Sequence, residues 1–420
     1  MTRDFIGAQR LLFLRLEFGR RNASTHYAIQ IVTMEKRMQT HTATIDRSYS
    51  RLVRAPRRIA VTLLAFILTF LASRTALAQE DGTIPDAFAS EALSACNVNF
   101  GEGAMFGYGL YPKVAISASG LAVEVEQLDG SIGKISYRIG QVSGSSVTWG
   151  DRYEVPIDPF TNLPAYRPSV AITKGGQVII VWSNSAGRGA SEVLLWYRVG
   201  QVDPNGGANQ RILWLTLPYT WDAGFNSSIA VNDNGLIVGV HESGTNGTGL
   251  YYRIGQFTDP PYSYHIKWTS GQYGIRYTGG VSPNIAINNL NQVVEVHQVQ
   301  ANEKLLHYVR GSISAPYSNI AFAGDQPRYH SNASEPTIAL LDSGLVIESH
   351  MESGKLGGMV GQLSTTDSIK INWACSLVFN PSVTNQERPE LAAIGNTAIL
   401  VTVGNPYTNN SRLYSYVSKF

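Results

Sequence analysis

The feature that most constrains this chain is a repeat that occurs six times at nearly constant spacing. Its marker is a branched aliphatic residue followed by Ala, and the intervals between markers are 56, 59, 56, 53 and 53 residues. The markers begin at Val114, Val170, Ile229, Ile285, Ile338 and Leu391. A fixed period of about 50 residues indicates a repeat architecture rather than one irregular core.

Each copy contains short runs of β-forming residues separated by turn residues. In the clearest copy, residues 229–268, the first turn reads Asn232-Asp233-Asn234-Gly235. These residue types tolerate the positive φ that tight hairpins require. A fourth run carries an aromatic residue in five copies, at Trp149, Trp214, Trp268, Phe322 and Trp373. Four antiparallel strands per period are typical of a β-propeller.

The ends of the repeat region predict how the ring closes. The last copy, residues 391–420, has three strand patterns only, and residues 97–101 form a lone strand pattern before the first copy. Joining the two completes a sixth blade and leaves no open sheet edge. We therefore predict an all-β fold, a six-bladed β-propeller of four-stranded antiparallel blades, with the N-terminal strand completing the last blade. A β-sandwich with a fortuitous period is the alternative.

Residues 1–78 read as a leader. Four arginines between positions 51 and 58 precede an apolar run, residues 59–72, that is short for a membrane span. Ala76-Leu77-Ala78 matches a signal-peptidase site, so we expect cleavage after Ala78. Residues 1–50 resemble neither a domain nor an ordinary leader. A start at Met38 would give a more ordinary leader than one at Met1, so we expect the true start to lie downstream of Met1. An uncleaved membrane anchor is the alternative.

The remaining chain divides into a linker at residues 79–92 and the propeller at 93–420. We expect it to be secreted or periplasmic, with no membrane insertion after cleavage. The leader holds 13 Lys or Arg and 4 Asp or Glu, a net charge of +9, whereas residues 79–420 hold 20 and 27, a net charge of −7. A mildly acidic chain lacks the basic face that nucleic acids require, so we expect no nucleic-acid partner.

Two cysteines, Cys96 and Cys375, remain in the exported chain. An even count in a secreted protein favours a disulfide. Cys375 follows the fourth strand of the fifth copy and Cys96 precedes the predicted closing strand, so a bond between them would staple the closure. Two buried thiols are the alternative.

Candidate binding residues recur on the face where the second strands end. Aromatic rings cover the apolar face of a sugar, and His, carboxylate or amide groups bind its hydroxyls. We therefore predict a glycan or cell-surface ligand, bound by repeated weak sites. The residues at or beside the strand ends are Glu126, Trp182, His241, Glu242, His297 and His350; those before the markers are Phe106, Trp221, Tyr277 and Tyr329. The alternative is that these residues pack blade against blade.

Other chemistry has weaker support in the sequence. Tyr-Arg pairs in the third strands, such as Tyr252-Arg253, suggest a carboxylate site, but one pair per blade favours structural pairing. No metal cluster, phosphate loop or nucleophile motif occurs, and we expect neither a cofactor nor a metal. A hydrolase would need a unique pair of carboxylates at the mouth of the central channel.

The repeat Ile/Val-Ala-x-Asn-x-x-Gly-x-Val-Val-x-Val-His-Glu/Gln, with Tyr-Tyr-Arg-Val/Ile-Gly-Gln after it, resembles repeats of secreted bacterial β-propeller proteins. It is more loosely similar to lectin-like and sialidase-like propellers. Residues 143–149 lack the Asp and Gly spacing of the sialidase Asp-box. The resemblance implies the fold, and carbohydrate or surface binding by a module that we expect to be non-enzymatic. A sialidase- or glycosidase-type hydrolase and an envelope protein-interaction scaffold are the alternatives.

Overall fold

The computed structural model describes the chain from residue 98 onward, with the backbone alone for Glu303, residues 326–331 and Val378. The described residues are 98–128, 133–157, 164–185, 193–206, 210–243, 249–258, 265–269, 274–300, 303–323, 326–331, 333–379, 386–404 and 411–420, with the backbone of 12–21, 24–34 and 40–43. The chain divides into two compact units, Met1–Thr83 and Ile84–Phe420. Every regular element in these residues is a β-strand. No helix suited to crossing a membrane occurs among them.

The first unit contains three strands within the predicted leader. β1 (Leu12–Arg21), β2 (Ser24–Met34) and β3 (Thr40–Ala43) form an antiparallel sheet in the order β1-β2-β3. Residues 51–78, with the predicted apolar run and cleavage site, lie outside the described residues. The signal peptide, and the linker at 79–92, therefore stay predictions.

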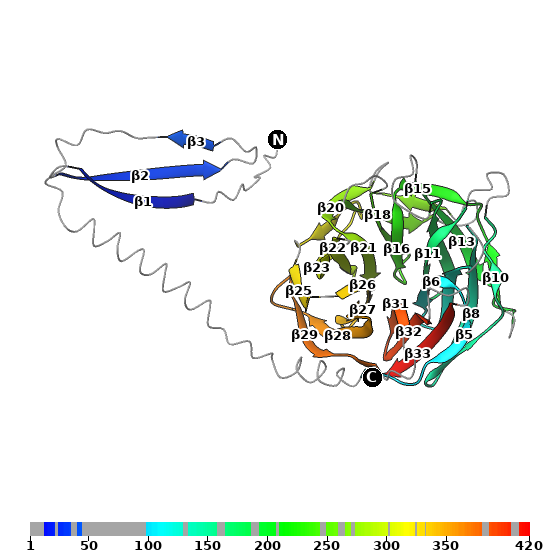
Figure 1. Cartoon of the computed structure of the whole chain (residues 1–420). Helices are drawn as coiled ribbons and strands as arrows, with labels where there is room; N and C mark the ends of the chain where they lie inside the picture. Colours follow the sequence, from blue (N-terminus) through cyan, green and yellow to red (C-terminus); the bar gives the residue numbers. More distant parts are fainter. Residues whose placement is uncertain are drawn as a thin grey trace. The chain divides into compact units, whose positions relative to one another are not determined.

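The second unit is a six-bladed β-propeller, which confirms the predicted fold (Figure 1). The first strand of each blade lies at the central channel and contacts the first strands of both neighbouring blades, so the ring is closed. These inner strands are β6 (Leu110–Ile116), β11 (Tyr166–Ile172), β16 (Phe225–Val231), β21 (Val281–Ile287), β26 (Ala333–Leu340) and β31 (Gln386–Ile394).

The second and third strands form the buried middle of each blade. The second strands are β7 (Leu121–Gln127), β12 (Gln177–Ser183), β17 (Leu236–Glu242), β22 (Gln292–Gln300), β27 (Leu345–Glu352) and β32 (Thr397–Gly404). The third strands are β8 (Ile135–Ser143), β13 (Leu194–Val202), β18 (Gly249–Phe257), β23 (Glu303–Ile313), β28 (Lys355–Leu363) and β33 (Arg412–Lys419). Their near-continuous apolar runs follow from burial on both faces by neighbouring blades.

The outer strand is split into two segments in the first four blades, and both segments pair with the same third strand. The segments are β9 (Ser146–Trp149) with β10 (Tyr153–Glu154), β14 (Ile212–Trp214) with β15 (Tyr219–Ala223), β19 (Ile266–Trp268) with β20 (Ile275–Gly279), and β24 (Ile320–Phe322) with β25 (Gln326–Ser331). The fifth blade has one outer strand, β29 (Ile371–Ser376).

An N-terminal strand completes the sixth blade, as predicted, but it is a different strand from the one expected. β5 (Ala104–Tyr108) pairs with β33, whereas residues 97–101 were expected there. In that segment β4 (Asn99–Phe100) pairs in parallel with β30 (Val378–Phe379), and the rings of Phe100 and Phe379 stack 5.5 Å apart. Phe100 is fully buried in the core shared by the last two blades, and this burial holds the segment at the seam.

A tyrosine on the third strand connects one blade to the next. The Tyr137 hydroxyl accepts a hydrogen bond from Ile212 N at 3.0 Å, and Tyr252 accepts one from Ile320 N at 3.2 Å. Burial raises the pKa of both tyrosines. The recurrent Tyr therefore satisfies the first backbone N–H of the next outer strand, which has no ladder partner of its own.

The predicted disulfide concerns the same seam between the last two blades. Cys375 lies on β29 opposite Val360 and is not a free thiol. Cys96 lies outside the described residues. The Cys96–Cys375 disulfide therefore stays a prediction.

Candidate functional site

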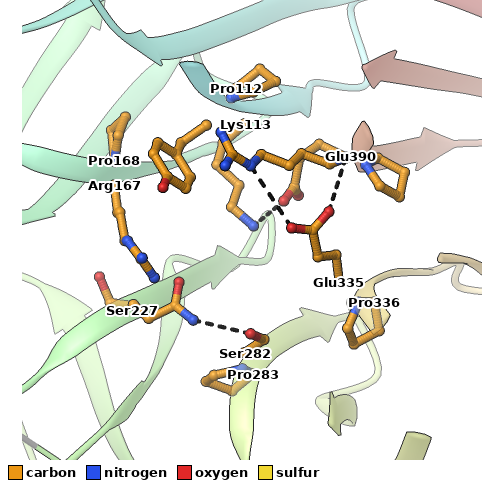
Figure 2. A pocket seen from close by; sticks show the side chains of 14 residues that line it. Pro112, Lys113, Arg167, Pro168, Ser227, Ser282, Pro283, Glu335, Pro336 and Glu390 are labelled. Atoms are coloured by element: carbon orange, nitrogen blue, oxygen red, sulfur yellow. Dashed lines mark hydrogen bonds and ion pairs between the residues drawn. The ribbon is translucent and has the colours of Figure 1, made fainter. Parts of the chain in front are cut away.

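The channel mouth is a polar pocket built from the beginnings of the six inner strands (Figure 2). Each inner strand contains a β-bulge there, where its pairing with the second strand shifts register. The bulged residues have φ between 48° and 53°. They are Tyr111, Arg167, Asn226, Ser282, Glu335 and Arg388, one from each blade.

This backbone conformation is unusual for the residues that adopt it. A left-handed φ disfavours most L-residues by roughly 1–2 kcal/mol, and Gly or Asn relieves that penalty. Only Asn226 among the six is such a residue. Bulges at barrel rims re-aim side chains, and retained strain marks functional sites. Backbone preference therefore does not explain the residue types at the other five positions.

Two residues further along, a second set of six side chains shows a structural pattern. The Ser169 hydroxyl accepts a hydrogen bond from Ile229 N of the next blade at 3.3 Å. The same contact recurs between Ser228 and Ile285 N, between Asn284 and Ile338 N, and between Thr337 and Leu391 N, at 3.0–3.2 Å. A short polar side chain at this position therefore joins neighbouring blades.

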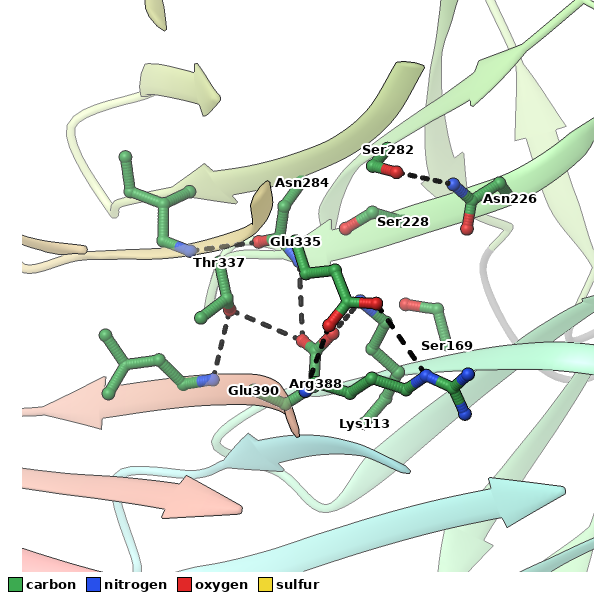
Figure 3. A network of polar contacts seen from close by, with 12 residues as sticks. Lys113, Ser169, Asn226, Ser228, Ser282, Asn284, Glu335, Thr337, Arg388 and Glu390 are labelled. Atoms are coloured by element: carbon green, nitrogen blue, oxygen red, sulfur yellow. Dashed lines mark hydrogen bonds and ion pairs between the residues drawn. The ribbon is translucent and has the colours of Figure 1, made fainter. Parts of the chain in front are cut away.

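Lys113 and Glu390 depart from this pattern in the first and sixth blades. They occupy the same position and form an ion pair with each other across the junction. Their side chains are 22% and 12% exposed. Glu390 also accepts hydrogen bonds from the Thr337 hydroxyl at 3.3 Å and from the Asn284 amide at 3.4 Å (Figure 3). In the four other blades, this position holds a short polar side chain that accepts a backbone hydrogen bond from the next blade.

Burial dominates the protonation of Glu390. It raises the pKa of Glu390 to about 7, although the Lys113 ammonium opposes the shift. The negative charge of Glu335 adds a smaller upward contribution. A carboxyl group with a pKa near 7 can both give and take a proton at neutral pH, as general acid–base chemistry requires.

Glu335 is the second carboxylate at the mouth. Its Oε2 accepts a hydrogen bond from Arg388 N at 3.1 Å, and its Oε1 lies 3.8 Å from Arg388 Nε. Burial raises the pKa of Glu335, and the Arg388 charge opposes the shift. Its side chain is 40% exposed, so solvent and ligands can reach it.

Tyr111 contacts two arginines at the rim. The guanidinium carbon of Arg388 lies 3.9 Å from the centre of its ring, and that of Arg167 lies 5.0 Å away. Such cation–π contacts orient both the ring and the guanidinium groups. The pocket thus combines a half-exposed aromatic ring with donors and acceptors. Its hollow measures about 600 Å³ when the open solvent at the mouth is included.

The channel becomes apolar below the mouth. The repeat markers and their neighbours line it there, among them Val114, Ala171 and Ile285. Beyond this apolar stretch, a second hollow at the opposite end of the channel is polar again, with Asn232, Asp233 and Asp342 among its lining residues. Among the described residues no group of three His, Cys, Asp or Glu is placed to hold a metal.

The predicted ligand-binding residues at the second-strand ends lie inside the blades. His297 and His350 are fully buried, with Nδ1 2.9 Å from Glu295 and 2.8 Å from Glu348 respectively. His241 Nε2 lies 3.1 Å from Asp222 Oδ2. Glu126, which accepts a hydrogen bond from Ser136, and Trp182 are buried as well. These contacts favour the packing alternative.

The predicted aromatic residues before the markers belong to outer strands rather than to connections. Trp221 is buried on β15 and stacks on Trp268 at 5.1 Å, and Tyr277 on β20 stacks on Phe322 at 4.9 Å. Phe106 on β5 stacks on Trp149 at 4.9 Å. Tyr329 lies on β25, and its side chain is outside the described residues.

Glu242, one of the predicted residues, contacts the pocket lining. Its Oε1 accepts hydrogen bonds from the Asn226 amide and from Ser282 N, both at 2.7 Å. Glu242 is buried behind the mouth, so it holds two bulged residues in place. The pocket opens at the same end of the blades as the predicted ring, one strand nearer the channel.

The Tyr-Arg pairs are structural in the described residues. Arg198 donates to Thr216 O at 2.8 Å and covers the Trp214 ring at 4.7 Å. Arg253 donates to Trp221 O, and its guanidinium carbon lies 5.1 Å from the centre of the Trp268 ring. These arginines satisfy carbonyl groups of outer strands and loops and do not converge on the channel.

Comparison with known proteins shows the fold. Neither a protein-family model nor a curated protein matches the chain. A Dyadobacter fermentans protein of unknown function has a TM-score of 0.50 at 12% identity, over 77% of this chain and 100% of its own. A Fusarium graminearum α-L-arabinofuranosidase, solved with an iminosugar inhibitor, has a TM-score of 0.50 at 10% identity, over 76% of this chain and 98% of its own.

The sialidase of Trypanosoma rangeli, in complex with a difluorinated nononic acid, has a TM-score of 0.50 at 14% identity over 76% of this chain. The match covers 54% of the sialidase, so the chain spans about half the length of that enzyme. These likenesses show that the chain is a six-bladed propeller similar to those of glycan-acting enzymes.

Proposed function

We propose that this protein binds a saccharide in the pocket at the channel mouth. The observation that carries the proposal is the ring of bulged, left-handed residues, which aims one polar, charged or aromatic side chain from every blade into one hollow. Tyr111 offers a ring for the apolar face of a sugar, and Asn226 and Ser282 offer hydrogen-bonding groups for hydroxyls. A pocket of this kind also favours saccharide binding over a flat protein-interaction scaffold.

The similar folds support this assignment without deciding it. The arabinofuranosidase and the sialidase are named for sugars and were solved with sugar-like inhibitors. In propellers generally the inner strands surround the one place that all blades can reach, so a ligand held there contacts many blades at once. The predicted leader adds that the protein acts outside the cytoplasm.

A glycan array with the purified protein tests the proposal. Tyr111→Asn removes the ring but keeps a residue that accepts left-handed backbone, so it should fold normally and lose binding. Tyr108→Asn is the matched control, since Tyr108 is 44% exposed on β5 and does not line the pocket. Equal binding by both variants and the unmodified protein would show that the ligand binds elsewhere.

Glycoside hydrolysis is a second candidate, because the mouth holds the pair of carboxylates that such a reaction needs. Glu390, with its pKa near 7, would protonate the leaving oxygen, and Glu335 would act as the second carboxylate. Glu390→Gln and Glu335→Gln should then abolish turnover of the array-identified glycan and preserve binding. The exposed Glu102→Gln is the control. Absence of turnover in the unmodified protein would leave a binding protein only.

A further inference from the structure

The charges at the channel mouth do not balance. Three cations and two carboxylates line the pocket. Lys113 pairs with Glu390, and Arg388 pairs with Glu335. Arg167 is the remaining cation, and among the residues the structure describes no carboxylate or carbonyl accepts a bond from it. Its contact there is with the Tyr111 ring.

Arg167 is held in the pocket and is not an exposed surface residue. It is half-buried, with a left-handed φ of 48° and Pro168 immediately after it. Figure 2 shows its side chain extending into the pocket toward Ser227. A guanidinium offers five donors in a planar fork and cannot lose its charge. A half-buried guanidinium group that has no hydrogen-bond acceptor is therefore available to bind an anionic group.

Ser227 supplies an independent observation beside it. The position after the bulged residue is Pro in the five other blades, at Pro112, Pro168, Pro283, Pro336 and Pro389. In the third blade it is Ser227, which is 4% exposed, lines the pocket and has a hydroxyl with no hydrogen-bond partner among the described residues. Buried polar atoms normally have a hydrogen-bond partner. The Ser227 hydroxyl is therefore also available to bond a ligand atom.

We infer that the bound saccharide is acidic, and that its anionic group lies against Arg167 and Ser227. This inference rests on the proposed function and adds the class of ligand. A carboxylate would accept two parallel bonds from the guanidinium of Arg167 and a third from the Ser227 hydroxyl. The neutral part of the sugar would then lie against Tyr111. A sulfate ester offers the same anionic chemistry and is distinguished by experiment.

The test compares matched ligands and matched variants by calorimetry on the full-length protein. The ligands are a uronic-acid oligosaccharide, its neutral methyl ester and a sulfated counterpart. The unmodified protein should bind the free acid at least about 30-fold more tightly than the ester, because the charged hydrogen bonds are lost. The preference should shrink as salt is raised. Tighter binding of the sulfated sugar than of the uronate would assign the anion as sulfate.

The variants separate this inference from the proposed function. Arg167→Asn should weaken binding of the acid by about 30-fold or more and leave binding of the ester within about 3-fold. Arg211→Asn is the control, because Arg211 is exposed next to β14 and does not line the pocket. Ser227→Pro restores the residue of the other blades, so it should fold and bind the acid more weakly.

The outcomes distinguish the acidic ligand from the saccharide pocket. Equal binding of acid and ester that Tyr111→Asn abolishes would overturn the acidic ligand and keep the saccharide pocket. Acid binding that survives Arg167→Asn would also overturn it. No binding of any of the three ligands or of any array glycan by the folded protein would overturn both.

Discussion

Lys113 and Glu390 form an ion pair that joins the neighbouring first and last blades at the channel mouth. The pair occupies the register in which Ser169, Ser228 and their equivalents join other blades through neutral hydrogen bonds. A largely buried ion pair is a weak source of stability, because desolvation offsets its Coulomb energy. Its place in the pocket therefore indicates a role in the site more than a role in closing the ring.

The raised pKa of Glu390 predicts a pH-dependent stability. The folded protein holds the proton more tightly than the unfolded chain, so the contribution of Glu390 is fully present below pH 4.5 and is lost as the pH rises through about 7. Between pH 4.5 and pH 8 the protein should lose on the order of 3 kcal/mol of unfolding free energy through this group. Glu390→Gln cannot titrate and should lack this loss.

Urea denaturation of both proteins at pH 5 and pH 8 measures the difference. Relative to the unmodified protein, Glu390→Gln should have a higher free energy of unfolding at pH 8 than at pH 5. Glu102→Gln, an exposed carboxylate outside the pocket, controls for the other acids of the chain. An unchanged difference between the two proteins at the two pH values would show that Glu390 is already ionised in the folded protein.

The fold could be predicted from the sequence because its signals are local. Alternation, turn residues and a period set the strands and their count, whatever the details of packing. The closing strand was missed because residues 97–101 and β5 both carry strand patterns, and the choice between them depends on which partner each meets. Burial of Phe100 at the seam makes that choice.

The proposed pocket could not be predicted from recurrence, because recurrence of a residue type in a propeller reflects packing as readily as binding. Residues such as His297 and Trp182 recur near one register because blades pack alike, and they are buried. In the proposed pocket, Lys113 and Glu390 are the positions at which the recurrent short polar residue is replaced by a charged one. A signal was present in the x-Pro pairs that precede five of the markers, but a left-handed Arg388 cannot be recognised from its residue type.

The tyrosine contacts between blades predict a specific loss of stability. Tyr137→Phe removes the acceptor of Ile212 N and leaves that buried N–H unsatisfied. The variant should lose about 1–3 kcal/mol of unfolding free energy, measured by urea denaturation. Tyr108→Phe changes an exposed ring and should stay within about 0.5 kcal/mol. Equal effects of the two substitutions would mean that water satisfies the Ile212 amide.

Trp221 distinguishes packing from recognition. Its ring is 2% exposed and lies against Trp268 and His241, so Trp221→Ala should cost about 3–5 kcal/mol through the cavity it leaves. Below its melting temperature the variant should still bind the array glycan. Tyr111→Asn should behave in the opposite way, with near-normal stability and no binding. A stable Trp221→Ala protein that loses binding would restore the outer ring as the ligand site.

The predicted Cys96–Cys375 bond can be tested chemically. Peptide mapping without reductant should recover one peptide that links the two cysteines, and reduction should lower the melting temperature. Cys375→Ser should lose about 2–5 kcal/mol of unfolding free energy, because the bond closes a very long loop in the unfolded chain. Reductant should have no further effect on that variant, which serves as the control. Two thiols that label in the unreduced, denatured protein would exclude the bond and leave the seam to β5 and to the pairing of β4 with β30.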